Sequence, residues 1–564
     1  MTNRSPNVPE NLDDLAQEYF DFLLEAWPSW GHLMGIYDHA DRFDDVSREG
    51  EERERQTRLA FAARAEAIPA DGLSPQDTIT REMLVFDGRR NAELLDARLA
   101  EFEVDPIFGQ QAGLPVRMPK FPIPNATVAE AMIPKVRGIA KNFRDMSDRV
   151  MEGVARKRTP AAFAIDDTVT QIDAWLAKPI EEDPLLNTAE PTGVADPSEW
   201  RRGLREVVAR DVRPAMAAYR DTIRDRVRPH ARDDAHVGLT WLADGEDVYD
   251  RLIRYHTTLG LSAQEIHDIG LAQIEHLAAE YRGLGQEVLG TSDVPEIFRR
   301  LRDDPALHHT SGADIVAASE TALAKATAAM GDWFGILPKA GCDVEEVQSG
   351  AIAFYFPPAR DGSRGGVFFM NTSQPSGWGR YQIEATSYHE GIPGHHLQLA
   401  IASELTDVPE FRKRAYIAAY GEGWGLYSER LADEMGLYST PLDRIGMLEA
   451  DSMRACRLVV DTGMHALGWS RQQAIDYMTE NSPMAVSQIV PEIDRYAVTP
   501  GQALAYMIGR LEIQRMRREA EARLGPAFDI KSFHDAVLGS GLMPLPVLDR
   551  VVGEWAERQP VGVA

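Results

Sequence analysis

Apolar residues recur with the period of an α-helix along most of the chain. Leu12, Leu15 and Tyr19 lie on or near one face of a predicted helix that Asn11 caps and that runs to about Trp27. Other long helices are predicted over residues 78–102, 128–158, 262–284 and 311–334, the third opening with a capping box. The pattern therefore predicts a large, mainly α, multi-helix protein.

Three segments depart from the helical pattern. Asp105–Thr127 holds five prolines and is predicted to be extended, and Pro179–Pro197 is acidic and proline-rich, typical of a flexible excursion. Ala351–Thr372 places β-rich runs on both sides of the turn-rich DGSRGG, which predicts a β-hairpin. Its second run, Val367–Met370, can either be structural or act as an edge strand that pairs with an extended substrate.

The size of the chain permits more than one domain. It has 564 residues, a mass of 62.7 kDa and 44% hydrophobic residues, enough for a large core. No Gly/Ser-rich linker or charge block divides it. We expect residues 1–240 to form a helical wall or lid and 241–564 to form the catalytic region, around one shared core.

Charge and cysteine content exclude several classes of protein. The formal net charge of −28 argues against binding to nucleic acid or to anionic membrane surfaces. Two cysteines cannot build a disulfide framework. The first residues, MTNRSPNVPENLDD, lack an apolar signal region, and no apolar run reaches the length of a membrane span. We therefore expect a cytoplasmic protein.

The candidate chemistry centres on HEGIPGHH, residues 389–396. It is similar to the H-E-x-x-H motif, in which two histidines on one helical face bind zinc and the glutamate activates water. On a straight helix, His389 and His396 would be roughly 10 Å apart, too far for one ion. Pro393 and Gly394 therefore predict a bulge or kink. His395 is the favoured second ligand, with His396 then in an outer or substrate-facing position; His396 is the alternative ligand.

A third metal ligand is expected on the next predicted helix, residues 415–436. Glu422 and Glu429 lie seven residues apart on one face of it. Gly421, Gly423 and Gly425 flank Glu422, and such costly helical glycines indicate the close approach of a backbone or a ligand. We assign Glu422 as the third ligand and Glu429 as a partner that orients a histidine.

The motifs HEGIPGHHLQ, GEGWGLYSERLADEMG, RLVVDTGMHALGWS and TPGQALAYMIGRLEI carry a family resemblance. Together they resemble the bacterial domain-of-unknown-function 885 family, strongly from residue 361 onward and loosely before it. That family looks related to the gluzincin peptidases, such as thimet oligopeptidase, carboxypeptidase Taq and angiotensin-converting enzyme. The resemblance implies a mostly helical fold, a deep cleft and peptide hydrolysis, and we expect the small sheet to lie near the cleft. The chain departs from the plain gluzincin motif at the Ile392-Pro393 insertion.

Further roles follow for other residues. Glu390 is expected to act as general base and then general acid. The resemblance implies a late tyrosine as oxyanion donor, and Tyr506 fits that place, with an ordinary core tyrosine as the alternative. Arg510, one turn beyond it, can clamp a substrate carboxylate or form a salt bridge. His465 is either a substrate-binding histidine or an interior one.

These observations favour a zinc-dependent metallopeptidase that acts on short peptides as a carboxypeptidase, dipeptidase or oligopeptidase. Zn²⁺ is the expected cofactor and a small peptide the expected partner. The alternatives are a zinc hydrolase of another amide or ester, and an inactive peptide-binding protein on a peptidase scaffold. The sequence leaves the oligomeric state open, with a homodimer as one option.

Overall fold

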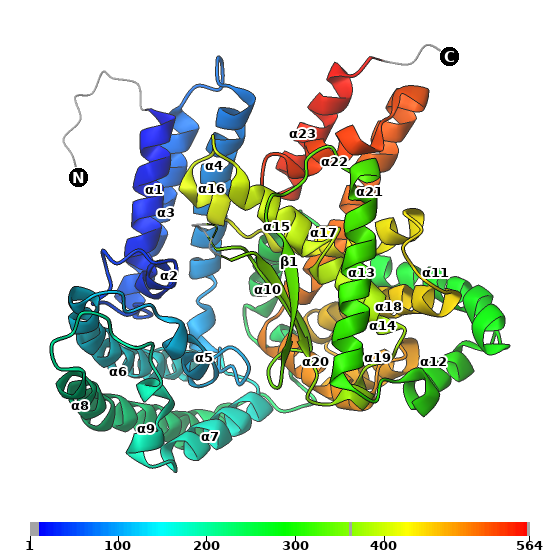
Figure 1. The fold of residues 1–564 in the computed structure, drawn as a ribbon. Coiled ribbons are helices and arrows are strands. Elements are labelled where there is room, and N and C mark those ends of the chain that lie inside the picture. The colour runs from blue at the N-terminus through cyan, green and yellow to red at the C-terminus, as the bar shows by residue number, and fades with distance from the viewer. Residues whose placement is uncertain (1–10, 360–361, 363, 561–564) are drawn as a thin grey trace. The chain divides into compact units, whose positions relative to one another are not determined.

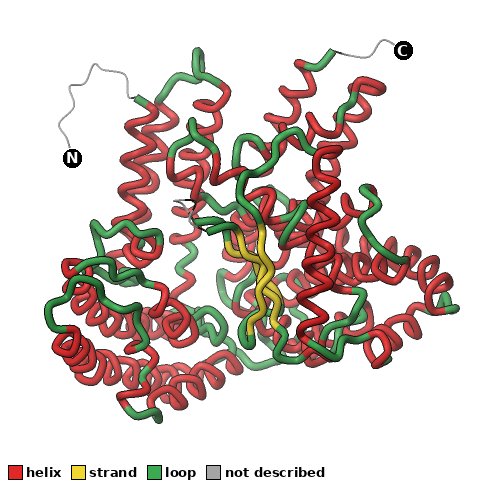
Figure 2. The backbone as a smooth tube through the Cα atoms, viewed as in Figure 1, coloured by secondary structure: helices red, strands yellow, loops and turns green. Residues whose placement is uncertain are grey.

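The computed structural model describes residues 11–359, 362 and 364–560, and helices dominate them (Figures 1 and 2). The mainly α class is confirmed. Most of the first residues used to predict localisation, and Asp361 and Ser363 of the predicted hairpin turn, lie outside the described residues. Within the described ranges, no helix combines the length and the apolarity needed to cross a membrane.

The chain divides into two compact units. Unit 1 holds residues up to 69, 84–251 and 468–472, and unit 2 holds residues 70–83, 252–467 and 473 onward. The division expected from the sequence, at residue 240, stays a prediction. The helices of unit 1 are α1 (Leu12–Ala26), α2 (Pro28–Leu33), α3 (Arg48–Ala67), α5 (Gln110–Arg117), α6 (Ala126–Ala155), α7 (Ala162–Leu176), α8 (Pro197–Val207) and α9 (Arg213–Asp221), with most of α4 (Pro75–Asp96) and half of α10 (Gly245–Thr257).

The core of unit 1 is built around α6. Met132, Val136 and Phe143 of this helix are fully buried and pack with residues of α8 and α9. The indole of Trp200 on α8 donates a 2.6 Å hydrogen bond to the carbonyl oxygen of Ala129. The apolar residues at helical spacing along α6 therefore face the core, as the sequence pattern predicts.

Unit 2 contains the remaining helices and the only sheet of the described residues (Figure 1). Its helices are α11 (Ala263–Leu289), α12 (Val294–Asp303), α13 (Gly312–Trp333), α14 (Gln382–Glu390), α15 (His395–Glu404), α16 (Glu410–Arg414), α17 (Ala418–Glu434), α18 (Pro441–His465), α19 (Arg471–Asn481), α20 (Val486–Val498), α21 (Ala505–Leu524), α22 (Ile530–Leu538) and α23 (Leu545–Arg558). The closest packing joins α11 to α18 and α17 to α21.

The sheet has three strands in the order β1-β3-β2, drawn in yellow in Figure 2. β2 (Ala353–Phe356) and β3 (Gly366–Asn371) form the predicted antiparallel hairpin. β1 (Cys342–Val347), which the pattern did not indicate, pairs with β3 in parallel. β3 is therefore the central strand, and the interpretation of Val367–Met370 as a substrate-pairing edge is wrong, because both sides of its backbone are already paired. Helices α13 and α14 contact the sheet.

The helix-start signals of the sequence are confirmed. The side chain of Asn11 accepts a hydrogen bond from the backbone of Asp13 at the start of α1, and the capping box of Ser262 and Glu265 is present at the start of α11. The extended path predicted for Asp105–Thr127 is wrong in part, because α5 lies within it and accommodates Pro115 inside the helix.

Candidate metal centre

The motif helix breaks where the sequence predicts a deformation. α14 ends at Glu390, the next four residues form a turn, and α15 begins at His395. A Cβ atom on Gly394 would lie 1.9 Å from the carbonyl oxygen of His389, so only glycine fits this turn. The indole of Trp424 fixes the turn by donating a 2.9 Å hydrogen bond to the carbonyl oxygen of Pro393.

The break brings His389, His395 and Glu422 together. One ligand atom from each lies within 4.8 Å of the others. Glu422 Oε2 is 3.7 Å from His389 Nε2 and 3.4 Å from His395 Nε2. Both histidines are buried and Glu422 is half-buried. The structure thus gathers all three residues predicted as ligands into one cluster, which we call the His-Glu cluster.

The distances from Glu422 Oε2 to the two histidines suit a zinc ion. Ligand atoms bonded at about 2.0–2.2 Å around a tetrahedral ion lie roughly 3.3–3.6 Å from one another. The two measured separations to Glu422 Oε2 fall at or next to this range. Two imidazole nitrogens and one carboxylate oxygen are also a donor set that zinc prefers, and three protein ligands leave a fourth position open.

Three glycines shape α17 around Glu422, each against a different neighbour. A Cβ on Gly425 would lie 2.7–3.1 Å from three atoms of the His389 imidazole. A Cβ on Gly423 would lie 2.5 Å from the backbone of Gly509 on α21. A Cβ on Gly421 would lie 3.0 Å from the ring of Tyr416. The predicted close approach of a backbone and of a ligand side chain is therefore confirmed.

Glu429 holds the His389 ring from the side opposite to the cluster. Its Oε1 lies 2.7 Å from His389 Nδ1, and the carboxylate is almost fully buried. Burial alone would lower the pKa of His389, but its contacts with Glu422 and Glu429 dominate and raise it to about 9. The carboxylate pair thus orients the ring and turns Nε2 toward Glu422, the arrangement of a histidine ligand with an outer carboxylate.

The contacts of His396 favour His395 as the second ligand. His396 Nε2 lies 3.0 Å from the carbonyl oxygen of Ala340, which can only accept, so this nitrogen carries the proton. His396 Nδ1 then accepts the hydroxyl of Tyr355 on β2, at 2.9 Å. Both ring nitrogens are engaged, and His396 fastens α15 to the sheet instead of facing the cluster.

Tyr416 is a part of the site that the sequence analysis missed. It lies in the extended link between α16 and α17, before the true start of α17 at Ala418. Its hydroxyl donates a short hydrogen bond to Glu422 Oε1, which leaves Oε2 to face the two histidines. The only local signal is its place six residues before Glu422, outside every motif.

Comparison with known proteins gives the chain its family. The family model described as "Bacterial protein of unknown function (DUF885)" matches residues 28–552. The chain belongs to this family. No curated protein sequence matches it.

Two solved structures resemble this DUF885 protein over nearly its whole length. One is a protein from Colwellia psychrerythraea provisionally described as a lipoprotein, with 25% sequence identity and a TM-score of 0.89, covering 98% of this chain and 100% of the other. The second is a protein of unknown function from Shewanella oneidensis, provisionally described in the same way, with 16% identity and a TM-score of 0.78, covering 96% and 99%. The second likeness shows a shared fold.

Two other predicted site residues of this DUF885 protein lie beside the His-Glu cluster. The rings of Tyr506 and His389 are nearly parallel, with centroids 6.5 Å apart. Burial and the nearby carboxylate of Glu422 raise the pKa of Tyr506, so its hydroxyl stays protonated. Glu390, the last residue of α14, is half-buried, and no hydrogen bond or ion pair engages its carboxylate within the described part of the chain.

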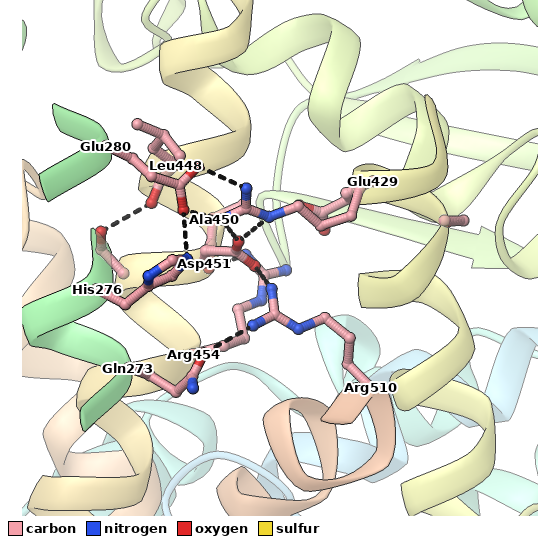
Figure 3. A network of polar contacts seen from close by, with 12 residues as sticks. Gln273, His276, Glu280, Glu429, Leu448, Ala450, Asp451, Arg454 and Arg510 are labelled. Atoms are coloured by element: carbon pink, nitrogen blue, oxygen red, sulfur yellow. Dashed lines mark hydrogen bonds and ion pairs between the residues drawn. The ribbon is translucent and has the colours of Figure 1, made fainter. Parts of the chain in front are cut away.

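Arg510 and His465 occupy internal positions instead. Arg510 is buried and paired with Asp451, and its second amino group donates to Gln273 Oε1 at 3.2 Å (Figure 3). The structure therefore shows the salt bridge that was the alternative to a substrate clamp. His465 is fully buried, with Nε2 3.1 Å from the carbonyl oxygen of Tyr496. This position agrees with the second interpretation of His465, that of an interior histidine.

Proposed function

We propose that this protein is a zinc-dependent metallohydrolase that cleaves short peptides. The observation that carries the proposal is the His-Glu cluster, in which a broken helix and a glycine-rich helix bring three ligand atoms within 4.8 Å. Exposed acidic groups often gather without a metal, but here both histidines are buried and one of them is oriented by a buried carboxylate.

The chain's own residues would hold the ion in a defined way. His389 and His395 would bind through Nε2, and Glu422 through Oε2, because its other oxygen is engaged by Tyr416. A zinc ion bound there would lower the pKa of water to about 7 and polarise the carbonyl group of a substrate.

Glu390 is the residue we assign as general base. It follows His389 directly, it is half-buried, and its carboxylate has no other partner in the described ranges. It would take a proton from the attacking water and deliver it to the leaving nitrogen. The neutral hydroxyl of Tyr506 beside His389 would donate to the oxyanion that develops on the substrate.

A relation to the gluzincin peptidases, with a deep cleft that admits short or unfolded peptides, is part of this proposal. The histidine pair, the intervening glutamate and the downstream glutamate ligand support it. The cytoplasmic location stays a prediction from the sequence. The lipoprotein description of the two similar structures favours a location outside the cytoplasm, and cell fractionation distinguishes the two.

Glu390→Gln tests the mechanism. The purified full-length protein, loaded with zinc, is assayed against a library of short peptides, amides and esters. We expect the wild type to hydrolyse peptides and Glu390→Gln to retain zinc while losing about 10²–10⁴-fold in kcat. Full activity in Glu390→Gln would contradict the assigned base. Hydrolysis of esters or non-peptide amides alone would keep the site and change the substrate.

A further inference from the structure

Three arginines gather around Tyr506. The guanidinium carbon of Arg457 lies 4.5 Å from the centroid of the Tyr506 ring, and that of Arg454 lies 5.8 Å from it. Arg495 of α20 acts electrostatically on the same tyrosine. The tyrosine that neighbours His389 is therefore also covered by positive charge.

These arginines are not equally paired. Arg457 and Arg495 both bind the carboxylate of Glu492, at 2.9 and 3.0 Å. Arg454 has no carboxylate partner among the described residues, and the hydrogen bond shown for it is one of 3.3 Å to the carbonyl oxygen of Ala450, one turn back on α18 (Figure 3). Its Nε atom is buried without a partner, as is Nη1 of Arg457.

Two other arginines near Arg454 do have a carboxylate partner. The protein carries a net charge of −28. Arg510 is paired with the buried carboxylate of Asp451 (Figure 3), and Arg430 binds the same carboxylate. The acid near Arg454 in sequence, Glu449, is buried, which raises its pKa to about 7, and it accepts from Gln382 instead. Of the three guanidinium groups around Tyr506, those of Arg457 and Arg495 bind Glu492, whereas Arg454 acts on Glu449 only electrostatically. Arg454 is half-buried, and a charge partly withdrawn from water without a partner is costly, so we expect an anion to bind beside it.

The site lies at a distance from the cluster that suits a peptide. The Tyr506 ring centroid lies 6.5 Å from that of His389 and 5.8 Å from the guanidinium carbon of Arg454. An extended peptide spans about 3.3–3.6 Å per residue. A carboxylate held by Arg454 would therefore belong to a residue no more than about three positions from the bond held at the His-Glu cluster.

We propose that Arg454 and Arg457, beside Tyr506, form a subsite for a carboxylate of the substrate, so that the preferred substrates are short peptides with a free C-terminal carboxylate close to the cleaved bond. The inference rests on the proposed function. It assigns carboxylate binding to Arg454 and Arg457 in place of Arg510, because the guanidinium of Arg510 is already paired with Asp451. Guanidinium groups bind carboxylates through charge-assisted hydrogen bonds, and Arg454 Nε and Arg457 Nη1 are donors without a partner.

Binding can be measured without turnover. The zinc-loaded Glu390→Gln protein is titrated by calorimetry with Ala-Ala-Phe and with the same tripeptide carrying a C-terminal amide. We expect the free acid to bind roughly 10- to 100-fold more tightly, as a charge-assisted hydrogen bond predicts. Adding Arg454→Gln should remove most of that difference. Arg444→Gln on the same helix, which only breaks a surface pair with Asp433, is the matched control and should keep it.

The outcomes separate this inference from the proposed function. Equal binding of acid and amide, no binding of either, or an equal loss for both peptides in Arg454→Gln would overturn the carboxylate subsite. A wild type that hydrolyses peptides without preferring the acid would keep the hydrolase and remove the subsite. A preference for the acid in Glu390→Gln, with no hydrolysis by the wild type, would keep the subsite and remove the hydrolase.

Discussion

Helices α6 and α17 are both buried, yet they are built for different purposes. α6 fills the core of unit 1 with large apolar side chains, and its buried polar side chains bond to segments distant in sequence, as when Lys135 donates to the carbonyl oxygen of Arg42. α17 instead has no side chain at Gly423 and Gly425, so that α21 and the His389 imidazole approach its backbone closely. It also buries carboxylates. A helix that loses packing volume to place charged groups indicates chemistry, whereas an apolar stripe indicates packing.

The largest expected effect comes from restoring a side chain to α17. In Gly425→Ala, the new methyl group would collide with the His389 ring, which Glu429 holds in place. Overpacking of this kind costs about 1–3 kcal/mol, and we expect zinc affinity to fall by about two orders of magnitude as the ring is displaced. Competition with a chelating indicator measures the affinity, and chemical denaturation measures the stability.

A glycine of unit 1 provides the matched control. Gly203 on α8 has only a methyl carbon of Ile133, at 3.9 Å, near the position of an added Cβ. Gly203→Ala should therefore stabilise the protein by about 0.5–1 kcal/mol and leave zinc affinity unchanged. If Gly425→Ala behaved like Gly203→Ala, the difference between the two kinds of helix would disappear.

Removing the outer carboxylate should have a smaller effect. In Glu429→Gln the His389 ring keeps a hydrogen-bonding partner but loses the charge that orients it. We expect zinc affinity to fall about 10- to 100-fold, with the fold retained. Isothermal titration with zinc gives the affinity, and circular dichroism verifies the fold. An unchanged affinity would show that Glu429 is structural and that α17 carries one functional carboxylate only.

Zinc binding should also depend on pH. Zinc needs the neutral imidazole of His389, whose pKa contacts with Glu422 and Glu429 raise to about 9 despite burial. Zinc affinity should therefore rise about tenfold per pH unit from pH 6.5 and level off near pH 9. In the zinc-free protein the sign is reversed. The protonated ring stabilises the fold fully below pH 6.5, and this contribution is lost as the pH rises through 9. Affinity that does not change over this range would contradict the raised pKa.

The motif region could be predicted because its information is local. Pro393 and Gly394 predict the helix break, and the glycines around Glu422 predict close approach, from the residues themselves. The contacts that favour His395 over His396 could not be predicted, because they are made by Tyr355 and Ala340, far away in the sequence. Likewise, the sequence allowed two interpretations of Arg510, because its partner Asp451 is distant in sequence and only the fold brings the two together.

The elements of the fold, too, could be predicted only where the signal lies in adjacent residues. The caps of α1 and α11 follow from adjacent residues and were predicted. β1 was missed because its sequence, CDVEEV, is short and acidic, and pairing with β3 rather than apolar alternation makes it a strand. α5 was missed because its proline reads as a helix breaker, while tertiary packing tolerates it there. Tyr416 lies outside α17 and reaches Glu422 only through the path of the chain between α16 and α17.

The most direct test of the account is the metal content of the full-length protein by plasma mass spectrometry after zinc reconstitution and desalting. The wild type is measured beside Glu422→Ala and beside His396→Gln, the control in which the neighbouring histidine is changed. The account predicts about one zinc per chain in the wild type and in His396→Gln, and less than about a tenth of that in Glu422→Ala. A wild type that retains no zinc, or a Glu422→Ala protein that retains as much as the wild type, would contradict it.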